Sequence, residues 1–130
     1  FLRKVKALEN IHLLGSRPSA VLPDYISRFD VCFDLLHATD PEDDVIPSRI
    51  YAYLLSGKPM VVMHLRYATP IFPDVVHNAE TSAEFLQQCE KALGEQNHWA
   101  RGRRKKYGAT AAWANRYRET CELLDVNGLI

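Results

Sequence analysis

The sequence predicts an α/β domain in which helices cover both faces of a mainly parallel sheet. Apolar runs of strand length at residues 11–14, 31–36 and 60–63 alternate with segments whose apolar residues have helical spacing. The run at 31–36 is apolar on both faces apart from Asp34, which is typical of a parallel strand between two helical layers. Successive units of strand, helix and strand connect in a right-handed sense and build a parallel sheet.

The composition fits one globular domain. A chain of 130 residues with 47% hydrophobic residues can bury a core. Charged residues make up 25% and the formal net charge is zero, which argues against disorder and against nucleic-acid binding. No apolar run approaches the roughly 20 residues of a membrane span, and the charged N-terminus is not that of a signal peptide. Because the chain starts at Phe1, we interpret it as a piece of a longer, cytoplasmic protein.

The first half of the chain is expected to contain two helices and two strands after the end of a helix at residues 2–8. In order they are a strand at 11–14, a short helix that starts near Pro23, a strand at 31–36 and a helix that starts near Pro47. Proline suits the first turn of a helix, where its missing N–H has no partner in any case. The helix near Pro23 also has Leu22, Ile26 and Phe29 at helical spacing.

Residues 46–62 carry the clearest local signals. Their sequence is Ile-Pro-Ser-Arg-Ile-Tyr-Ala-Tyr-Leu-Leu-Ser-Gly-Lys-Pro-Met-Val-Val. Gly57 stands where a helix would end in the left-handed conformation, and a strand is expected at residues 60–63 after the turn at Lys58 and Pro59. The N–H groups and the dipole at the start of this helix would favour a bound phosphate.

The second half continues the alternation. A short strand is expected at residues 74–77, a helix after Thr81, a basic helical segment at 95–108 and a last helix capped by Thr110. Thr81 and Glu84 have the spacing of a capping box. The helix after Thr81 has five apolar residues on one face, namely Phe85, Leu86, Cys89, Ala92 and Leu93. The last helix has four residues on one side that we expect in the core: Trp113, Tyr117, Cys121 and Leu124.

These segments together resemble the C-terminal, nucleotide-sugar-binding half of glycosyltransferases with the GT-B fold. In that family a tyrosine-rich helix that starts with proline precedes Gly-Lys-Pro and a valine-rich strand, as residues 46–62 do here. The other matching segments are Asn-Ile-His-Leu-Leu-Gly at 10–15, Leu-Pro-Asp-Tyr-Ile at 22–26, Phe-Asp-Val-Cys-Phe at 29–33, Phe-Pro-Asp at 72–74 and the helix at 81–93. The similarity extends over about residues 10–125 in the same order.

The resemblance implies a Rossmann-like, three-layer α/β/α domain, which is half of a GT-B fold. Residues 1–130 would form one donor-binding domain, and its first strand and the N-terminal acceptor domain would lie outside this chain. The parent enzyme would transfer a sugar from a UDP- or GDP-sugar to an acceptor, with the nucleotide-sugar as substrate and no further cofactor. We expect the isolated chain to be inactive, because the other wall of the cleft belongs to the acceptor domain.

The expected site lies at the carboxyl ends of the strands, where open α/β sheets bind their ligands. By resemblance, the nucleotide would lie near Gly15, Ser16, Arg17 and Ala52, and the diphosphate and sugar near Asp44, Pro47, Ser48 and Arg49. The Arg49 guanidinium and the amides of Ser48 and Arg49 are the expected phosphate ligands. Asp44 and Arg49 also have plain structural interpretations, as a helix N-cap and as a solvated helix residue.

Ala52 departs from the family pattern. The family commonly has two acidic residues eight positions apart, of which the second binds the ribose hydroxyls. Asp44 occupies the first position and Ala52 the second. A carboxylate–hydroxyl bond contributes roughly 1.5–3 kcal/mol, so either another residue holds the ribose, or the nucleotide binds weakly, or the protein is a non-catalytic relative.

Several other residue groups are weaker candidates. His37 and His64 end strands on the expected ligand edge and could carry a proton near neutral pH. The basic residues between Arg101 and Lys106 could contact anionic lipid at the inner membrane face, although a solvated helix face is the favoured explanation. The acidic loop at 40–44 lacks the spacing of a calcium site, and Cys32, Cys89 and Cys121 lack metal-site spacing and are expected to be buried thiols.

Three rival functions stay open at this stage. The first is a non-catalytic binding or scaffold domain with the GT-B fold, which Ala52 favours. The second is half of a nucleotide-sugar epimerase, which would need acid and base groups from outside this chain. The third is an unrelated flavodoxin-like module. The base, sugar, acceptor, stereochemistry and oligomeric state are not readable from the residues.

Overall fold

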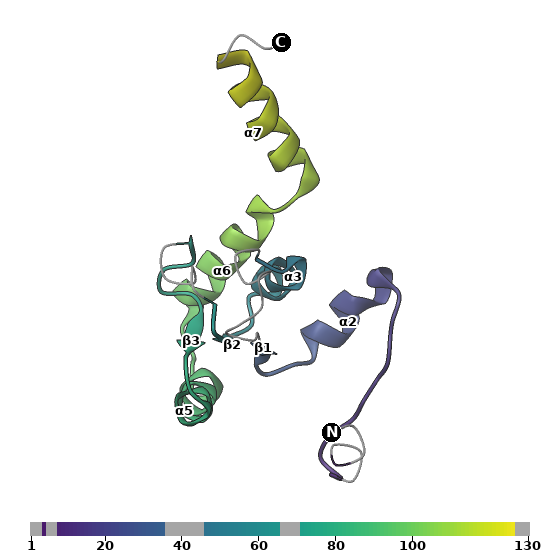
Figure 1. The fold of residues 1–130 in the computed structure, drawn as a ribbon, viewed down its shortest axis with the longest axis vertical. Coiled ribbons are helices and arrows are strands. Elements are labelled where there is room, and N and C mark those ends of the chain that lie inside the picture. The colour runs from purple at the N-terminus through teal and green to yellow at the C-terminus, as the bar shows by residue number, and fades with distance from the viewer. Residues whose placement is uncertain (1–3, 5–7, 36–45, 66–70, 127–130) are drawn as a thin grey trace.

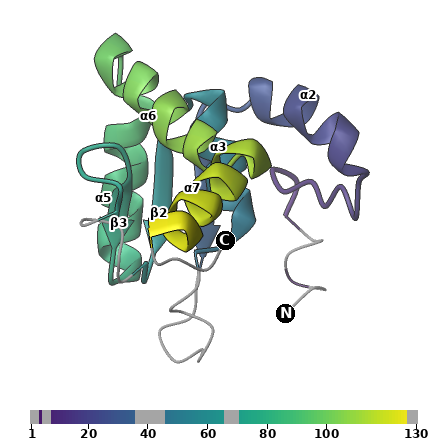
Figure 2. The same cartoon turned by 90° about the horizontal axis from the view of Figure 1, so that it is seen from above.

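The structure is a computed structural model that describes residues 4, 8–35, 46–65 and 71–126. Three parallel strands lie between two layers of helices (Figure 1, Figure 2). The elements are a 3-10 helix η1 (Ser19–Val21), α2 (Leu22–Ser27), β1 (Cys32–Leu35), α3 (Ser48–Ser56), β2 (Met60–Met63), β3 (His77–Ala79), α5 (Ser82–Leu93), α6 (His98–Thr110) and α7 (Trp113–Val126). The predicted α/β fold class with a parallel sheet is confirmed.

The sheet has the order β1-β2-β3, and both neighbouring pairs are parallel. Cys32 pairs with Met60 and Leu35 with Met63, while Val61 pairs with His77. The strand predicted at 60–63 is confirmed at those bounds. The strand predicted at 74–77 instead begins at His77, because Asp74 adopts a left-handed conformation with φ 61° and so keeps the chain in a turn.

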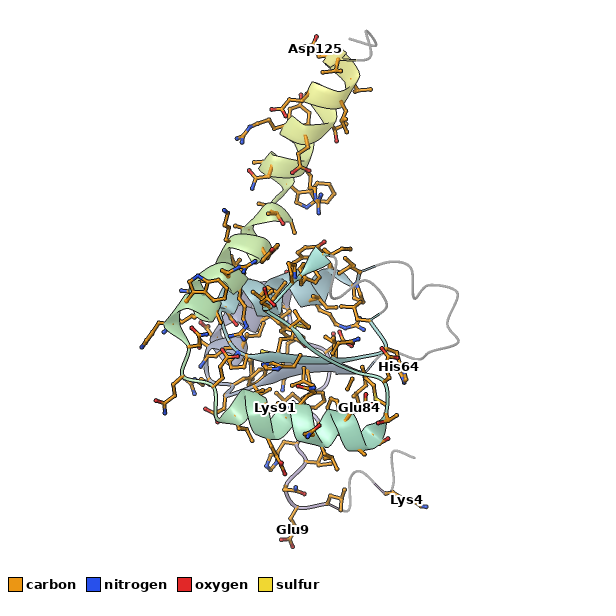
Figure 3. All side chains as sticks on the ribbon, turned by 90° about the vertical axis from the view of Figure 1, so that its left-hand side faces the viewer. Lys4, Glu9, His64, Glu84, Lys91 and Asp125 are labelled. Atoms are coloured by element: carbon orange, nitrogen blue, oxygen red, sulfur yellow. The ribbon has the colours of Figure 1, made fainter. Side chains whose placement is uncertain are left out.

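The hydrophobic core lies between the sheet and α3. Ile50 and Leu54 of α3 are fully buried against Met60 and Val62 of β2, and Phe72 closes one side. The opposite face of the sheet is covered by α5, which contacts β2 and β3 (Figure 3). Continuous apolar strands covered on both faces are what parallel sheets require.

Both ends of α3 follow from its sequence. Pro47 is the N-cap rather than a first-turn residue, with φ −59° and ψ 136°, so the predicted helix start is shifted by one position. Gly57 ends the helix in the left-handed conformation with φ 77°, as predicted. The Gly57 N–H donates to Leu54 O and satisfies one of the last carbonyls.

Of the two other helix caps predicted from the sequence, the one at Thr81 is confirmed and the one at Thr110 is wrong. Thr81 caps α5 by accepting a hydrogen bond from the Glu84 N–H at 3.2 Å, as the capping box predicts, and Glu84 accepts from the Glu80 N–H at 2.9 Å. Thr110, however, is the last residue of α6 and not the cap of α7. Its hydroxyl donates to Tyr107 O at 2.6 Å, so it is already bound to the preceding turn.

Residues 11–14 do not form the predicted strand. Their side chains are all exposed and the segment makes no sheet pairing. Figure 1 shows this N-terminal segment beside α2 and apart from the strands. An apolar run becomes a strand only when a neighbouring strand supplies the ladder of hydrogen bonds, and none of the three described strands lies beside it.

The aromatic residues of α7 are not core residues. Trp113 is 89% exposed and Tyr117 is 73% exposed, and α7 has no buried residue. Figure 1 shows α7 extending away from the sheet. The predicted helical spacing is correct, but the stripe has no element of the described chain packed over it.

The face predicted for α5 is only partly buried. Ala92 is buried, and Phe85 and Cys89 are partly buried, whereas Leu86 and Leu93 are about two-thirds exposed at 65% and 66%. Helix α5 packs on β2 and β3, so the part of its apolar face that extends beyond them stays uncovered. None of the described helices combines the length and the apolar character needed to cross a bilayer.

Candidate functional site

A groove of about 350 Å³ lies between α2 and the first half of α3. Three parts of the chain line it: the loop that precedes η1, the helix α2 with the residues just after it, and the first two turns of α3. The lining residues are Leu14, Gly15, Arg17, Leu22, Tyr25, Ile26, Phe29, Ser48, Arg49, Ala52 and Tyr53. Segments far apart in the sequence therefore meet in one concave surface.

One end of the groove, at Ser48 and Arg49, lies beside the carboxyl end of β1, whereas its other end includes Phe29, which precedes that strand. Asp34 is the third residue of the four-residue strand, and its carboxylate is bonded to Arg49 in the first turn of α3. The start of α3 therefore stands next to the point where β1 ends. This is the edge of a parallel sheet where ligands bind in open α/β folds.

Five of the residues that the sequence suggested for ligand binding are in this lining. Gly15, Arg17, Ser48, Arg49 and Ala52 meet there. Ser16 is exposed but is not part of the lining, and Pro47 is half-buried at the start of α3. Asp44 and His37 lie outside the described residues, as does the acidic loop at 40–44.

His64 is placed elsewhere. It follows β2 with a left-handed φ of 60°, and its Nδ1 lies 3.3 Å from Glu80 Oε2. Figure 3 shows it beyond the end of the sheet, on the side where α5 begins near Glu84. His64 is therefore at the predicted edge but is not among the residues that line the groove.

The polar end of the groove is built on an ion pair between Arg49 and Asp34. The Arg49 Nη2 donates to Asp34 Oδ1 at 3.0 Å, and Nε donates to Asp34 Oδ2. Asp34 is only 6% exposed, whereas the Arg49 side chain is 54% exposed. The hydrogen bond with Asp34 raises the pKa of Arg49, so this guanidinium stays charged.

The start of α3 offers backbone donors. Pro47 has no side-chain group that could cap the helix, and no side chain of the described residues caps it. Ser48 and Arg49 are exposed. Their N–H groups point along the helix axis at the positive end of its dipole, where anions are stabilised.

The rest of the groove is mostly apolar. Tyr25 of α2, Phe29 just after α2 and Tyr53 of α3 supply aromatic side chains, and Ala52 leaves a small, exposed surface between Arg49 and Tyr53. Burial, followed by the nearby Asp34 charge, raises the pKa of Tyr53, which keeps its hydroxyl protonated. No carboxylate is among the described lining residues, so the groove fits a ligand with an apolar or aromatic part and an anionic part.

A larger hollow of about 520 Å³ lies at the opposite edge of the sheet. Its lining includes Lys58 and Pro59, which precede β2, and Asn97 and His98 at the start of α6. Asn97 already caps α6 by accepting from the N–H groups of Trp99 and Ala100. Because this hollow faces the amino ends of the strands, we treat the smaller groove as the candidate site.

Two charged residues that line this larger hollow, Glu95 and Arg104, are paired with each other within the fold. Arg104 is 1% exposed and donates to both Glu95 carboxylate oxygens at 2.6 Å and to Val75 O at 2.8 Å. His77 Nε2 lies 3.2 Å from Glu95 Oε2. These bonds join α6 to the turn before β3 and to the connection between α5 and α6.

The basic run of α6 does not form one surface. Arg104 is buried, whereas the side chains of Arg101 and Lys105 lie beside Gly57 of α3. Arg103 stacks on the Trp99 ring at 4.6 Å and lies 3.7 Å from Asp74. The side chains of this run therefore point in at least three directions.

The described part of the chain contains no candidate metal-binding site. No group of three or more histidine, cysteine or acidic side chains there could hold an ion. All three cysteines are free thiols. Cys32 is buried, which raises its pKa to about 11, whereas Cys89 and Cys121 are only partly buried.

Asp34 is the functional candidate that sequence reasoning missed. The available signal was a single carboxylate inside the apolar run at 31–36, since a buried charge requires a partner. The fold and the groove define an α/β domain with a parallel sheet and a groove that includes the start of α3. Comparison with models of protein families, with curated proteins and with solved structures gave no match.

Proposed function

We propose that this domain binds a nucleoside diphosphate, and its sugar conjugate, in the groove between α2 and α3, as the donor-binding half of a GT-B glycosyltransferase. The observation that carries the proposal is the meeting of Gly15 and Arg17 with Ser48 and Arg49 around one groove. The sequence resemblance assigned these two segments to the nucleotide and to the diphosphate, respectively. The two segments line the same groove, so one bound molecule could contact both of them.

The chemistry of the groove is consistent with such a ligand. A nucleoside diphosphate combines a flat aromatic base with a group that carries about two negative charges. The aromatic residues Tyr25, Phe29 and Tyr53 would contact the base or ribose. The first-turn amides of α3 and the guanidinium groups of Arg17 and Arg49 would bind the phosphates.

Catalysis would need groups beyond those in the groove. The lining has no acid or base positioned for sugar transfer among its described residues. In the proposed parent enzyme, the acceptor would be bound by the N-terminal domain. We therefore expect the 130-residue chain to bind donor and not to turn it over.

Isothermal titration with UDP, GDP and their sugars tests the proposal. We expect dissociation constants between micromolar and low millimolar, weakened at least tenfold by Arg17→Ala, because Arg17 lines the groove and its loss leaves the Asp34–Arg49 pair intact. Lys106→Ala is a matched control, since Lys106 is an exposed cation on α6 outside the groove. Absence of binding to every one of these nucleotides would exclude the proposal.

One observation favours a second function, a binding or scaffold domain that has lost the donor site. Ala52 stands at the position of the ribose-binding acid, and no described residue of the groove supplies a carboxylate instead. Such a domain would use the largely apolar groove without a nucleotide. The same titration separates the two functions, because a scaffold domain would bind none of the nucleotides.

A further inference from the structure

We propose that Asp34 is a positioning residue that holds the Arg49 guanidinium in a fixed orientation toward a phosphate or diphosphate in the groove. This inference rests on the proposed function and deepens it, because it assigns the geometry of anion recognition. It concerns the ion pair between the end of β1 and the first turn of α3. Asp34 and Arg49 are both charged, and neither belongs to the hydrophobic core cluster.

The geometry of the pair leaves part of the guanidinium free. Asp34 is bonded through Nε and Nη2, which are the two donors on one side of the planar group. A guanidinium carries five N–H donors, so the edge formed by Nη1 and the second Nη2 hydrogen has no bond to Asp34. Two parallel N–H groups on that edge match two oxygens of one phosphate or carboxylate.

Burial makes Asp34 the fixed member of the pair. Its side chain is 6% exposed on β1, whereas the Arg49 side chain is 54% exposed and lines the groove. A long, exposed arginine normally samples many rotamers, and ordering such a side chain on binding weakens affinity. Bonding to a buried carboxylate orders the side chain before the ligand arrives.

Asp34 has two opposite effects on an anionic ligand. Its negative charge repels the ligand, while its hydrogen bonds fix the orientation of Arg49. If the charge dominated, removal of Asp34 would tighten binding. The side-on fork with a buried carboxylate indicates that orientation dominates, so Asp34→Asn is expected to weaken binding. An asparagine offers one acceptor and one donor to two guanidinium donors and cannot keep the fork.

The test is a double-mutant cycle with Asp34→Asn and Arg49→Lys, read by titration with UDP and with inorganic pyrophosphate. Arg49→Lys keeps the positive charge and gives buried Asp34 a cation, but a lysine has no second edge. We expect each single variant to weaken binding about five- to tenfold. In the Arg49→Lys background, Asp34→Asn should no longer weaken binding, because the fork is already absent and the substitution then removes only the repulsion between the carboxylate and the anion.

Thermal denaturation of the same variants separates positioning from stability. A merely structural role for Asp34 would lower the melting temperature without coupling its effect on ligand affinity to Arg49. The inference is overturned if Arg49→Lys binds as tightly as the wild type, if Asp34→Asn tightens binding, or if its effect persists unchanged in the Arg49→Lys background. The first of these outcomes requires only the Arg49→Lys variant, so the inference can be overturned even if Asp34→Asn does not fold.

The two probes distinguish failure of this inference from failure of the proposed function. If pyrophosphate binds with the expected coupling but UDP and GDP bind no better than pyrophosphate, the nucleotide function fails and the role of Asp34 stands. If the nucleotides bind without coupling between the two positions, the function stands and the inference fails. If neither pyrophosphate nor a nucleotide binds, both are excluded.

Discussion

Arg104 illustrates how this domain buries a charged side chain. The residue is 1% exposed, yet Nε, Nη1 and Nη2 each donate a hydrogen bond, to Val75 O or to the Glu95 carboxylate. Removal of one partner from a buried pair typically costs about 3–5 kcal/mol, because the other charge is left without compensation. The pair thus joins α6 to the rest of the fold, and its ionisation should be visible in the pH dependence of stability.

The first prediction concerns Glu95. The hydrogen bond from Arg104, and in addition that with His77, hold the pKa of Glu95 below its usual value of 4.5. A group with a lowered folded-state pKa stabilises the fold above its usual pKa and loses this contribution as the pH falls through the folded-state value. The free energy of unfolding should therefore decrease below about pH 4.5.

Urea unfolding at pH 5.5 and at lower pH values, down to pH 3, measures this effect. Glu95→Gln should be less stable than the wild type at pH 5.5 by about 1.5–3 kcal/mol, because the charge on the acceptor of Arg104 is lost. This is less than the cost of removing the partner outright, since the glutamine amide oxygen can still accept one hydrogen bond from Arg104. The variant should also lose less stability than the wild type on acidification. If the free energy of unfolding fell by the same amount in both proteins between pH 5.5 and pH 3, Glu95 would not contribute to the loss of stability in acid.

The second prediction concerns Ala52, which lines the groove and is exposed. If the nucleotide lies as proposed, Ala52→Glu would supply the carboxylate that the resemblance expects for the ribose. A charged hydrogen bond contributes roughly 1.5–3 kcal/mol, so the dissociation constant for UDP should fall by about tenfold or more. Ala52→Gln has nearly the same size without the charge and should give a smaller gain. Unchanged affinity in Ala52→Glu would place the ribose elsewhere.

At the scale of elements, the closest helix contact depends on one glycine. Helices α3 and α6 cross where Gly108 faces Leu55, and a Cβ at Gly108 would stand 2.4 Å from the Leu55 backbone nitrogen. That contact involves backbone, so it cannot be relieved by a side-chain rotation. The position requires a residue without a side chain because α6 lies directly on α3.

The third prediction uses two glycines of the same helix. Gly108→Ala should lower the free energy of unfolding by about 1–3 kcal/mol, because the two helices must separate to admit the methyl group. Gly102→Ala is the matched control, since a Cβ there would meet nothing within 4 Å. It should raise stability by up to about 1 kcal/mol through helix propensity alone. Equal effects of the two substitutions in denaturant titrations would contradict this account of the crossing.

Elements were predictable from the sequence where local chemistry decides their ends. The left-handed Gly57, the Thr81 cap and the apolar run at 60–63 each depend on neighbouring residues, and all three are confirmed. Residues 11–14 and the stripe on α7 that begins at Trp113 also have the right periodicity. Their burial, however, requires a partner from elsewhere, which periodicity does not reveal.

At the scale of the whole molecule, the sequence could indicate which segments contribute to the candidate site but not how they connect. The β-α-β rule places the carboxyl ends of strands at one edge, which brings Ser48 and Arg49 to that edge. The bond between Asp34 and Arg49 joins residues 15 positions apart on a strand and a helix, so no local spacing could predict it. The apolar wall from α2 likewise depends on how that short helix packs beside α3.

The fourth prediction concerns which edge of the sheet binds ligand. The domain has hollows at both edges, and the one lined by Lys58, Asn97 and His98 is the larger. Two of its charged residues, Glu95 and Arg104, are paired within the fold, although Lys58 and Arg101 also line it. Among the described residues, the smaller groove has the second guanidinium edge of Arg49 and the first-turn amides of α3 without a side-chain partner. Size alone would favour the larger hollow, whereas the rule that open parallel sheets bind at their carboxyl ends favours the groove that includes the start of α3.

Amide chemical shifts recorded during a titration with UDP would decide between the two edges. We expect the largest changes at Gly15, Arg17, Ser48 and Arg49, and none above background at Lys58 or Asn97. Lys58→Ala should leave the dissociation constant unchanged within twofold, because Lys58 lies at the amino end of β2, at the sheet edge opposite the groove. Shifts centred on Lys58 and Asn97 would instead place the ligand at the amino edge, against the rule that open parallel sheets bind at their carboxyl ends.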